Sequence, residues 1–191
     1  MSKPRLIFNL PRAAAWRSMY DWDMGDPGID AVTHLRQAFE AMARYAACGL
    51  EGEPVTLNQL EILLLLDVAK VPLTASEIAS YSFRELHTIS EMLTRMEAEG
   101  YIRRIPSSED RRKTEIQLQP EGQALLKRVK AGYGRCGRLL NSSMTQEELR
   151  QLDMLARKVR DCTLQELDYG LHPLPDILDW SRAIRPPDEQ P

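Results

Sequence analysis

The stretch that decides the fold runs from residue 86 to residue 122 and reads LHTISEMLTRMEAEGYIRRIPSSEDRRKTEIQLQPEG. Its first part carries apolar residues at spacings of three and four, which is typical of one face of an α-helix: Leu86, Ile89, Leu93 and Met96. Gly100 then predicts the end of the helix, because glycine readily adopts the left-handed conformation found just beyond a helix C-terminus. We therefore expect a helix ending at Gly100, with its apolar stripe facing a core.

Two short strand-like segments follow this helix. Residues 101–105 form the first and residues 113–118 the second, in which apolar and polar residues alternate. The polar turn between them, residues 106–112, ends in adjacent arginines. A helix followed by a hairpin with a basic tip can address duplex DNA at two places, because a helix fits the major groove and a hairpin tip reaches phosphates or the minor groove. The stretch therefore predicts a winged helix-turn-helix.

The residues before this stretch supply the remaining helices of such a unit. Residues 57–70 are apolar almost throughout but too short to span a membrane, which indicates a buried core helix. A proline then interrupts the chain, and Thr74 with Glu77 has the capping-box pattern that begins a second helix over residues 75–81. A turn at residues 82–84 leads into the third helix, so helix, turn and recognition helix come in the expected order.

This region resembles the DNA-binding domain of the MarR family of bacterial winged helix-turn-helix transcriptional regulators. The resemblance covers about a third of the chain sharply. It rests on residues in the second helix, the recognition helix and the wing: Thr74, Glu77, Ile78 and Ala79; Thr88, Ile89, Ser90, Leu93 and residues 96–104; Asp110, Arg111, Arg112, Leu118 and Gly122. The resemblance implies a regulator that binds a pseudo-palindromic operator in double-stranded DNA.

Composition limits the kind of DNA contact that is possible. The chain has 191 residues, 43% of them apolar, and a formal charge of −3, so DNA binding must come from a local basic patch. The wing supplies one, in residues Arg103, Arg104, Arg111, Arg112 and Lys113. Neither a signal peptide nor a membrane-length apolar run is present, so we expect a cytoplasmic protein without a membrane partner. The few, widely spaced cysteines argue against a disulfide framework or a zinc site: Cys48, Cys136 and Cys162.

The expected fold class is mainly α with a small β-wing. We divide the chain into an N-terminal arm (1–28), a helical region (29–52 and 120–170), the winged helix-turn-helix domain (53–119) and a C-terminal tail (171–191). Amphipathic helices expected at 29–50, 119–142 and 145–167 need partner helices for their apolar stripes. In the MarR family the N- and C-terminal helices of two subunits interlock into a dimerisation domain, which implies a homodimer. Its recognition helices would lie roughly 34–36 Å apart, one turn of DNA.

With the apolar stripe inward, the rotation of a helix places a second set of residues outward, as candidates for DNA contact: Arg84, His87, Thr88, Glu91, Thr94 and Arg95. Thr88 suits a thymine methyl, Glu91 can accept from a cytosine amine, and Arg95 is placed for phosphate. Alternatively, Glu91 forms a surface salt bridge with Arg95, four residues on.

The wing carries the second set of candidate DNA contacts. The resemblance assigns Asp110 to bracing the wing and Arg112 to DNA, with Arg111 and Ser107 as further contacts. The alternative is that these arginines are a solvated turn in a protein that does not bind DNA.

No enzyme, metal or cofactor site is expected. Residues 132–137 spell G-x-G-x-x-G, but they lie inside a helical pattern rather than between a strand and a helix, as a dinucleotide site requires. The glycines instead indicate a kink or a close helix crossing. The three histidines lack metal-ligand spacing, and no nucleophile motif is present: His34, His87 and His172.

The resemblance also implies an effector, because many MarR-like proteins bind small aromatic acids between the dimerisation helices and the winged domain and then release DNA. It places Met42, Tyr45 and the helix at 57–70 at that crevice, with His34 or Arg36 as carboxylate partners; ordinary core or surface positions are the alternative. Trp16, Tyr20 and Trp22 in the arm either line this pocket or pack over the domain or a partner subunit. Two other functions stay open: a redox sensor using Cys48, and a winged helix that contacts only proteins.

Overall fold

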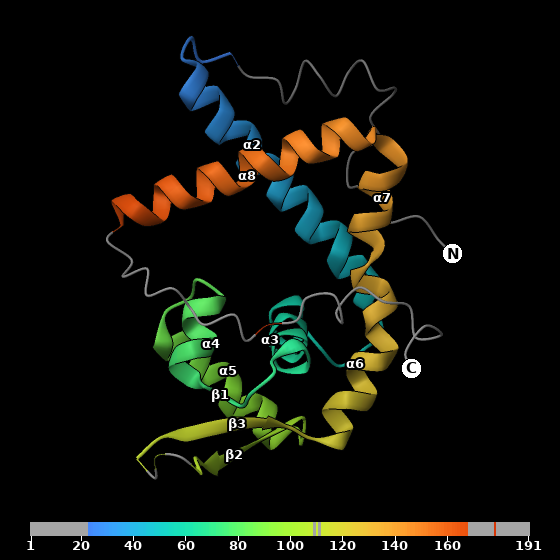
Figure 1. The fold of residues 1–191 in the computed structure, drawn as a ribbon. Helices are drawn as coiled ribbons and strands as arrows, with labels where there is room; N and C mark the ends of the chain where they lie inside the picture. The colour runs from blue at the N-terminus through green and yellow to red at the C-terminus, as the bar shows by residue number, and fades with distance from the viewer. Residues whose placement is uncertain (1–22, 109, 111, 168–177, 179–191) are drawn as a thin grey trace.

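The structure, a computed structural model, describes residues 23–108, 110, 112–167 and 178. Mostly helical, it carries one three-stranded antiparallel sheet, as expected for a mainly α fold with a β-wing (Figure 1). Helices α3, α4 and α5 and the sheet form the lower part in Figure 1; α2 and α8 form the upper part, and α6 and α7 connect the two. Trp16, Tyr20, Trp22 and Arg111 lie outside the described residues.

Local capping interactions set where the helices of the winged region begin. Helix α3 (Leu57–Val68) starts with a capping box in which the Thr56 N–H donates to Gln59 Oε1 (2.9 Å) and the Gln59 N–H donates to Thr56 Oγ1 (3.3 Å). Helix α4 (Ala75–Tyr81) starts with the predicted box of Thr74 and Glu77. The recognition helix α5 spans Leu86–Ala98.

The first wing strand is shifted by one residue from the prediction, and the second begins one residue later than predicted and ends at the predicted residue. Strand β2 is Ile102–Pro106 and strand β3 is Thr114–Leu118, paired so that Arg104 lies opposite Ile116. A third strand, β1 (Leu73–Thr74), pairs with the other edge of β3 and was not predicted, because two residues carry no periodicity. Sheet order is β1-β3-β2.

One apolar core joins the three helices to the sheet. Its fully buried members include Leu60, Leu63, Leu73, Ile78, Ile89, Leu93, Met96 and Ile102. Helix α6 (Pro120–Tyr133) adds Leu125, Leu126 and Val129 to the same cluster. The base of α6 is therefore packed on the winged region. One predicted core residue is wrong: Leu86 is 48% exposed, and Met92 is buried in addition to the other three predicted residues. Leu86 lies in the first turn of α5, beyond the end of the core.

The connecting helix is broken where the glycines predicted a kink. The continuous helix expected over 119–142 is two helices, α6 and α7 (Arg135–Ser143), separated at Gly134. Three glycines within six residues weaken a helix because each costs ~1 kcal/mol relative to alanine. Helix α2 (Pro27–Ala47) is followed by a short 3-10 turn, Cys48–Leu50, which completes the helix predicted at 29–50. Helix α8 (Gln146–Glu166) starts with the predicted box of Thr145 and Glu148.

Candidate nucleic-acid interface

The recognition helix exposes a polar face beside the wing. Ile89, Leu93 and Met96 are fully buried, so the opposite side of α5 faces solvent and carries the exposed residues His87, Glu91, Thr94 and Arg95. Ser90, Glu91, Thr94 and Arg95 line a shallow hollow on this side. Helix α5 and the β2–β3 hairpin lie together at the end of the molecule away from α2 and α8 (Figure 1).

Two of the predicted contact residues are engaged within the protein. The Arg84 guanidinium donates to Asn58 Oδ1 (2.8 Å) and Glu61 Oε2 (3.2 Å), which ties the turn before α5 to helix α3. The Thr94 hydroxyl donates to the Ser90 carbonyl at 2.9 Å, and the Ser90 hydroxyl donates to the Leu86 carbonyl at 2.8 Å. These hydroxyls therefore use their protons inside the helix.

Glu91 and Arg95 point outward without bonding to each other. Among the described ion pairs none joins these two residues, so the predicted alternative of a surface salt bridge is wrong in this structure. Both groups are exposed. Thr88 is half-buried, and its hydroxyl lies 3.3 Å from His87 Nε2. The free carboxylate and guanidinium are thus the charged groups that this face offers.

A salt bridge fixes the wing to the recognition helix. The Arg104 N–H donates to Glu97 Oε1 (2.8 Å) and its guanidinium forms an ion pair with the same carboxylate. That guanidinium also donates to Thr94 Oγ1 (3.1 Å) and to the Ser90 carbonyl (3.3 Å). The pKa of the Glu97 carboxyl is held below its usual value, first by the Arg104 backbone hydrogen bond and then by its side chain. Sequence reasoning placed Arg104 in the basic patch and missed this role.

The end of α5 is closed by a turn that needs glycine. Gly100 has φ +77°, the Gly100 N–H donates to the Glu97 carbonyl (3.0 Å), and the Tyr101 N–H donates to the Met96 carbonyl (2.9 Å). These two bonds form a Schellman motif, in which a left-handed residue satisfies the last carbonyls of a helix. The chain passes directly from the recognition helix into β2, so the wing has a fixed starting point.

Hydrogen bonds hold the tip of the wing. The Arg112 N–H donates to Asp110 Oδ1 (3.0 Å), and the Lys113 N–H donates to the Asp110 carbonyl (2.8 Å). The Ser107 N–H donates to the Lys113 carbonyl (3.0 Å). Ser107 is 5% exposed, so its side chain belongs to the interior of the hairpin rather than to its surface. Arg103, Arg112 and Lys113 are exposed, and they leave positive charge on the outside of the wing.

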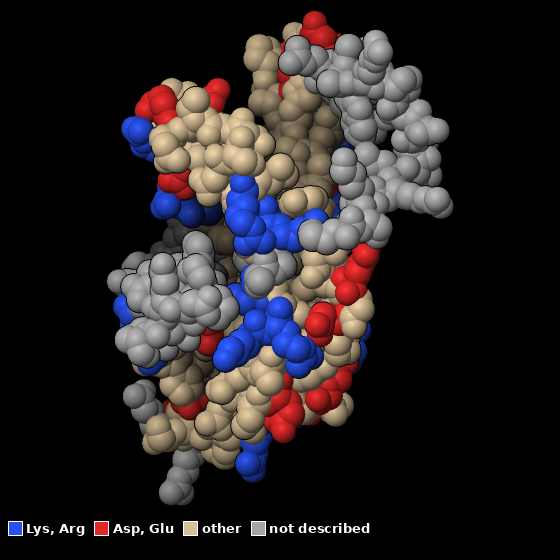
Figure 2. All heavy atoms as spheres, turned by 90° about the vertical axis from the view of Figure 1, so that its right-hand side faces the viewer, with Lys and Arg blue, Asp and Glu red and all other residues tan. Residues whose placement is uncertain are grey.

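A second basic region lies on the connecting helices. Figure 2 shows Lys and Arg gathered in the middle of the face formed by α6 and α7. Residues 122–146 contain cations but no Asp or Glu: Lys127, Arg128, Lys130, Arg135 and Arg138. Arg128 pairs with Glu53 (3.1 Å) and Lys130 with Asp67 (3.5 Å), so part of this charge is neutralised by neighbouring elements. These pairs support the base of α6 rather than adding to the wing.

Comparison with known proteins decides the family. The MarR family model matches residues 55–114. The chain is 31% identical to the homoprotocatechuate degradative operon repressor of Escherichia coli over 129 residues, which cover 63% of this chain and 81% of the relative. The chain belongs to the MarR family.

Solved MarR-family structures share the fold. The chain matches the S. aureus MepR–DNA complex with a TM-score of 0.62 and 25% identity, over 67% of this chain and 94% of that one. It matches AbsC from Streptomyces coelicolor with a TM-score of 0.66 and 22% identity, over 74% and 97%. A match to mutant MarR C80S from E. coli complexed with operator DNA has a TM-score of 0.65 and 21% identity, over 72% and 99%.

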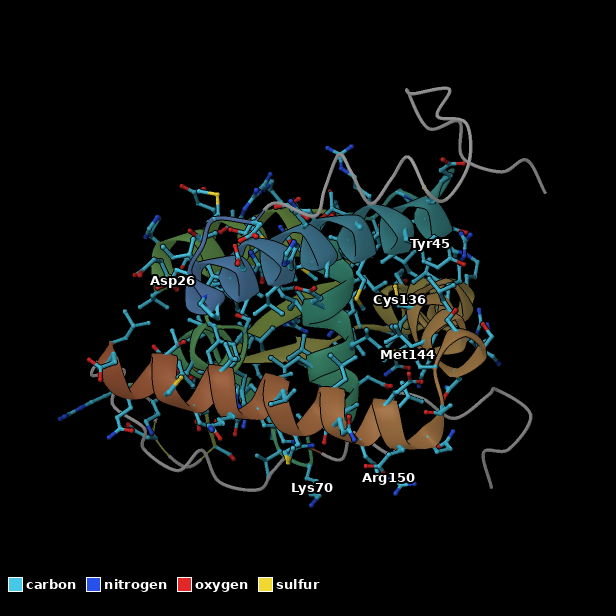
Figure 3. All side chains as sticks on the ribbon, turned by 90° about the horizontal axis from the view of Figure 1, so that it is seen from above. Asp26, Tyr45, Lys70, Cys136, Met144 and Arg150 are labelled. Atoms are coloured by element: carbon cyan, nitrogen blue, oxygen red, sulfur yellow. The ribbon has the colours of Figure 1, made fainter. Side chains whose placement is uncertain are left out.

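The residues that the MarR resemblance suggested for an effector lie along α2. His34 is half-buried, and its Nε2 atom is buried without a hydrogen-bond partner. Arg36 and Met42 are exposed. Tyr45 is half-buried beneath Arg135, whose guanidinium carbon lies 4.6 Å from the ring centroid. Tyr45 and Cys136 lie at the junction of α2 with α7 (Figure 3).

Within the described ranges, no group of three or more His, Cys, Asp or Glu residues can hold a metal ion. None of the described helices is long and apolar enough to cross a membrane. Cys48 and Cys136 are half-buried, and Cys136 donates to the Met42 carbonyl (3.6 Å).

Proposed function

We propose that this MarR-family regulator is a homodimeric repressor that binds a pseudo-palindromic operator and releases it when a small aromatic acid binds. The observation that carries the DNA-binding part is the arrangement of α5 and the wing. The ion pair of Glu97 with Arg104 joins α5 to the wing. The exposed polar side chains of α5 and the exposed basic side chains of the wing lie at one end of the molecule. A helix in the major groove and a basic hairpin tip on the flanking backbone can then bind as one rigid unit.

The dimer is supported by apolar surface at the other end of the molecule. Every residue from 150 to 163 on α8 is exposed, although the helix carries an apolar stripe that includes Leu152, Leu155 and Val159. Phe39 and Val32 on α2 are exposed as well. Such helices owe their stability to burial of the apolar face, so a second copy of the chain is the occupant that fits.

The effector part is supported by chemistry on α2 and by a relative. The buried Nε2 of His34 has no partner, and an aromatic acid would supply a carboxylate for it. Tyr45, under Arg135, offers an aromatic and cationic surface nearer the end of the same helix. The E. coli relative is named for the degradation of homoprotocatechuate, which is an aromatic acid.

The test is fluorescence anisotropy with duplex DNA from upstream of the protein's own gene, against a scrambled duplex, at ~0.15 M salt. We expect at least ~10³-fold preference for the upstream duplex. Addition of a panel of aromatic acids should release the DNA for one member, and His34→Gln should bind DNA normally but respond weakly. Arg36→Gln distinguishes the two candidate carboxylate partners, because it should leave the response to the acid unchanged if His34 is the partner.

The outcomes separate the parts of the proposal. Specific binding that no acid relieves would retain the regulator and remove the aromatic effector. Equal affinity for both duplexes would contradict DNA-specific regulation and favour a winged helix that contacts only proteins. Loss of binding on peroxide treatment that Cys48→Ser prevents would favour the redox alternative.

A further inference from the structure

Two large apolar side chains are exposed at the N-terminal end of the recognition helix. Leu86, the first residue of α5, is 48% exposed, and Phe83, in the turn before it, is 56% exposed. Phe83 has φ +52°, a conformation that bulky residues rarely adopt. Isolated exposed apolar residues are ordinary on protein surfaces. Here two large exposed apolar residues lie within four positions of each other, at the N-terminal end of the recognition helix, which suggests that they have a common function.

Two polar side chains beside this apolar pair are already engaged within the protein. Arg84 lies between the two residues but donates to Asn58 and Glu61 on α3. The Ser90 hydroxyl, one turn further along α5, donates to the Leu86 carbonyl itself. The Arg84 guanidinium and the Ser90 hydroxyl are therefore engaged within the protein, and the exposed charged residues nearest to the apolar pair are the carboxylates Glu85 and Glu91.

We propose that Leu86 and Phe83 contact the 5-methyl groups of thymines in the major groove, so that the operator is read partly through thymine. This inference rests on the proposed function, because it assumes that α5 enters the groove. Thymine is the DNA base that carries a methyl group on the major-groove edge, and apolar side chains recognise it by contact. Recognition helices enter the groove with their N-terminal residues foremost, which is where both side chains lie.

The charges around Leu86 and Phe83 also favour an apolar contact with DNA at this end of α5. Glu85 and Glu91 flank the end of α5, and Arg84 is neutralised by Glu61, so the charged side chains at this end of the helix do not attract DNA phosphates. Exclusion of water between carbon surfaces gives a favourable contribution that does not depend on charge. The basic wing then supplies the salt-dependent affinity, while the apolar pair and Glu91 supply base preference.

The experiment replaces single thymines by deoxyuridine, which removes the methyl group and keeps base pairing. The probe is the duplex from upstream of the protein's own gene, titrated with the intact protein by anisotropy. For one or two thymines in each half-site we expect affinity to fall about fourfold, from the loss of one buried methyl group. Leu86→Ala and Phe83→Ala should bind the thymine duplex more weakly and lose the difference between thymine and uracil at the contacted position.

Val71→Ala is the matched control, because Val71 is similarly exposed (47%) but lies between α3 and β1. This variant should retain the full sensitivity to uracil. Thermal unfolding of each variant checks that the fold is intact, and the uracil scan of the unchanged protein gives a result even if a variant is unstable.

Specific binding with no loss on any uracil substitution would overturn the inference while retaining the proposed function. Uracil sensitivity that persists in both variants would also overturn it and move the contact to Thr88. Absence of any preference for the upstream duplex would overturn the proposed function and this inference together.

Discussion

At the scale of single residues, Asp110 and Arg112 have different roles at the tip of the wing: Asp110 stabilises the turn, and Arg112 is available to contact DNA. Asp110 accepts the Arg112 backbone N–H, which leaves the Arg112 guanidinium outside the turn and exposed. Ser107 faces the interior of the hairpin. A DNA contact by Ser107 is therefore disfavoured, although the residue type and position made it a reasonable candidate.

Arg112→Ala should weaken binding to all sequences alike and reduce the slope of log affinity against log salt by about one unit, because one fewer counterion is released. Anisotropy titrations at several salt concentrations measure the slope. Arg150→Ala is the control, since it removes the same charge from a side chain that is 71% exposed and belongs to α8, at the other end of the molecule from the wing (Figure 1). An unchanged slope in Arg112→Ala would remove this residue from the set of phosphate contacts.

Phe83 gives a prediction about backbone strain. Its φ of +52° is unfavourable for any residue with a Cβ atom, by roughly 1–2 kcal/mol. Phe83→Gly should therefore be more stable than Phe83→Ala by about 1 kcal/mol. At most positions the alanine variant is the more stable of the two, because glycine loses more backbone entropy on folding. Urea unfolding of both variants measures this difference. A more stable alanine variant would show that residue 83 does not hold a positive φ in solution.

At the scale of elements, the contact of Glu97 with Arg104 couples α5 to β2. Because the folded-state pKa of Glu97 is lowered, its contribution to stability is present above the unfolded pKa of about 4.3 and is lost as pH falls through the folded value. Glu97→Gln should be less stable than the unchanged protein at pH 7, and the difference should shrink below roughly pH 4.

The test is to measure the free energy of unfolding of Glu97→Gln and of the unchanged protein by chemical denaturation at pH 7 and at about pH 3.5 to 4, within the titration range of glutamate. Glu91→Gln, on the same helix but without a described ion pair, should change stability little at either pH. A Glu97→Gln deficit that is the same at both pH values would mean that packing rather than the carboxylate charge gives the effect.

Gly122 fixes how closely α6 approaches the wing. A Cβ atom at this position would lie 2.3 Å from the Tyr101 carbonyl oxygen and 2.9 Å from Leu118 Cδ1. Gly122→Ala should therefore lower the free energy of unfolding by about 1–3 kcal/mol, because the backbone must move. Gly137→Ala is the control, since its Cβ would meet nothing within 4 Å. Equal effects of the two substitutions would contradict this packing.

The elements differ in how far the sequence predicts them. Helix starts at Thr74 and Thr145 were predicted correctly because a capping box involves residues only three positions apart. The exposure of Leu86 was not predictable from periodicity, because the stripe continues past the end of the core. The pairing of Arg84 with Glu61 joins residues 23 positions apart, and no local pattern signals it.

At the scale of the whole molecule, the two ends present opposite surfaces. One end carries the wing and α5, and the other carries the exposed apolar residues of α2 and α8. In Figure 3, seen from above, α2 and α8 lie at opposite edges of the view. Both helices lie apart from the apolar core, which contains no residue of α2 or α8 among its buried members. An isolated chain leaves this surface in water.

Leu155→Asp should therefore convert the proposed dimer to a monomer, because it places a charge on the apolar side of α8, where Leu155 is 55% exposed. Light scattering after size-exclusion chromatography measures the mass. Val71→Asp is the control, with a similarly exposed apolar residue outside α2 and α8. Specific DNA affinity should fall steeply in Leu155→Asp, since each monomer reaches one half-site and loses the gain of binding two linked sites. A chain that is monomeric without substitution, or a Leu155→Asp dimer, would contradict the assignment of this surface to a second copy.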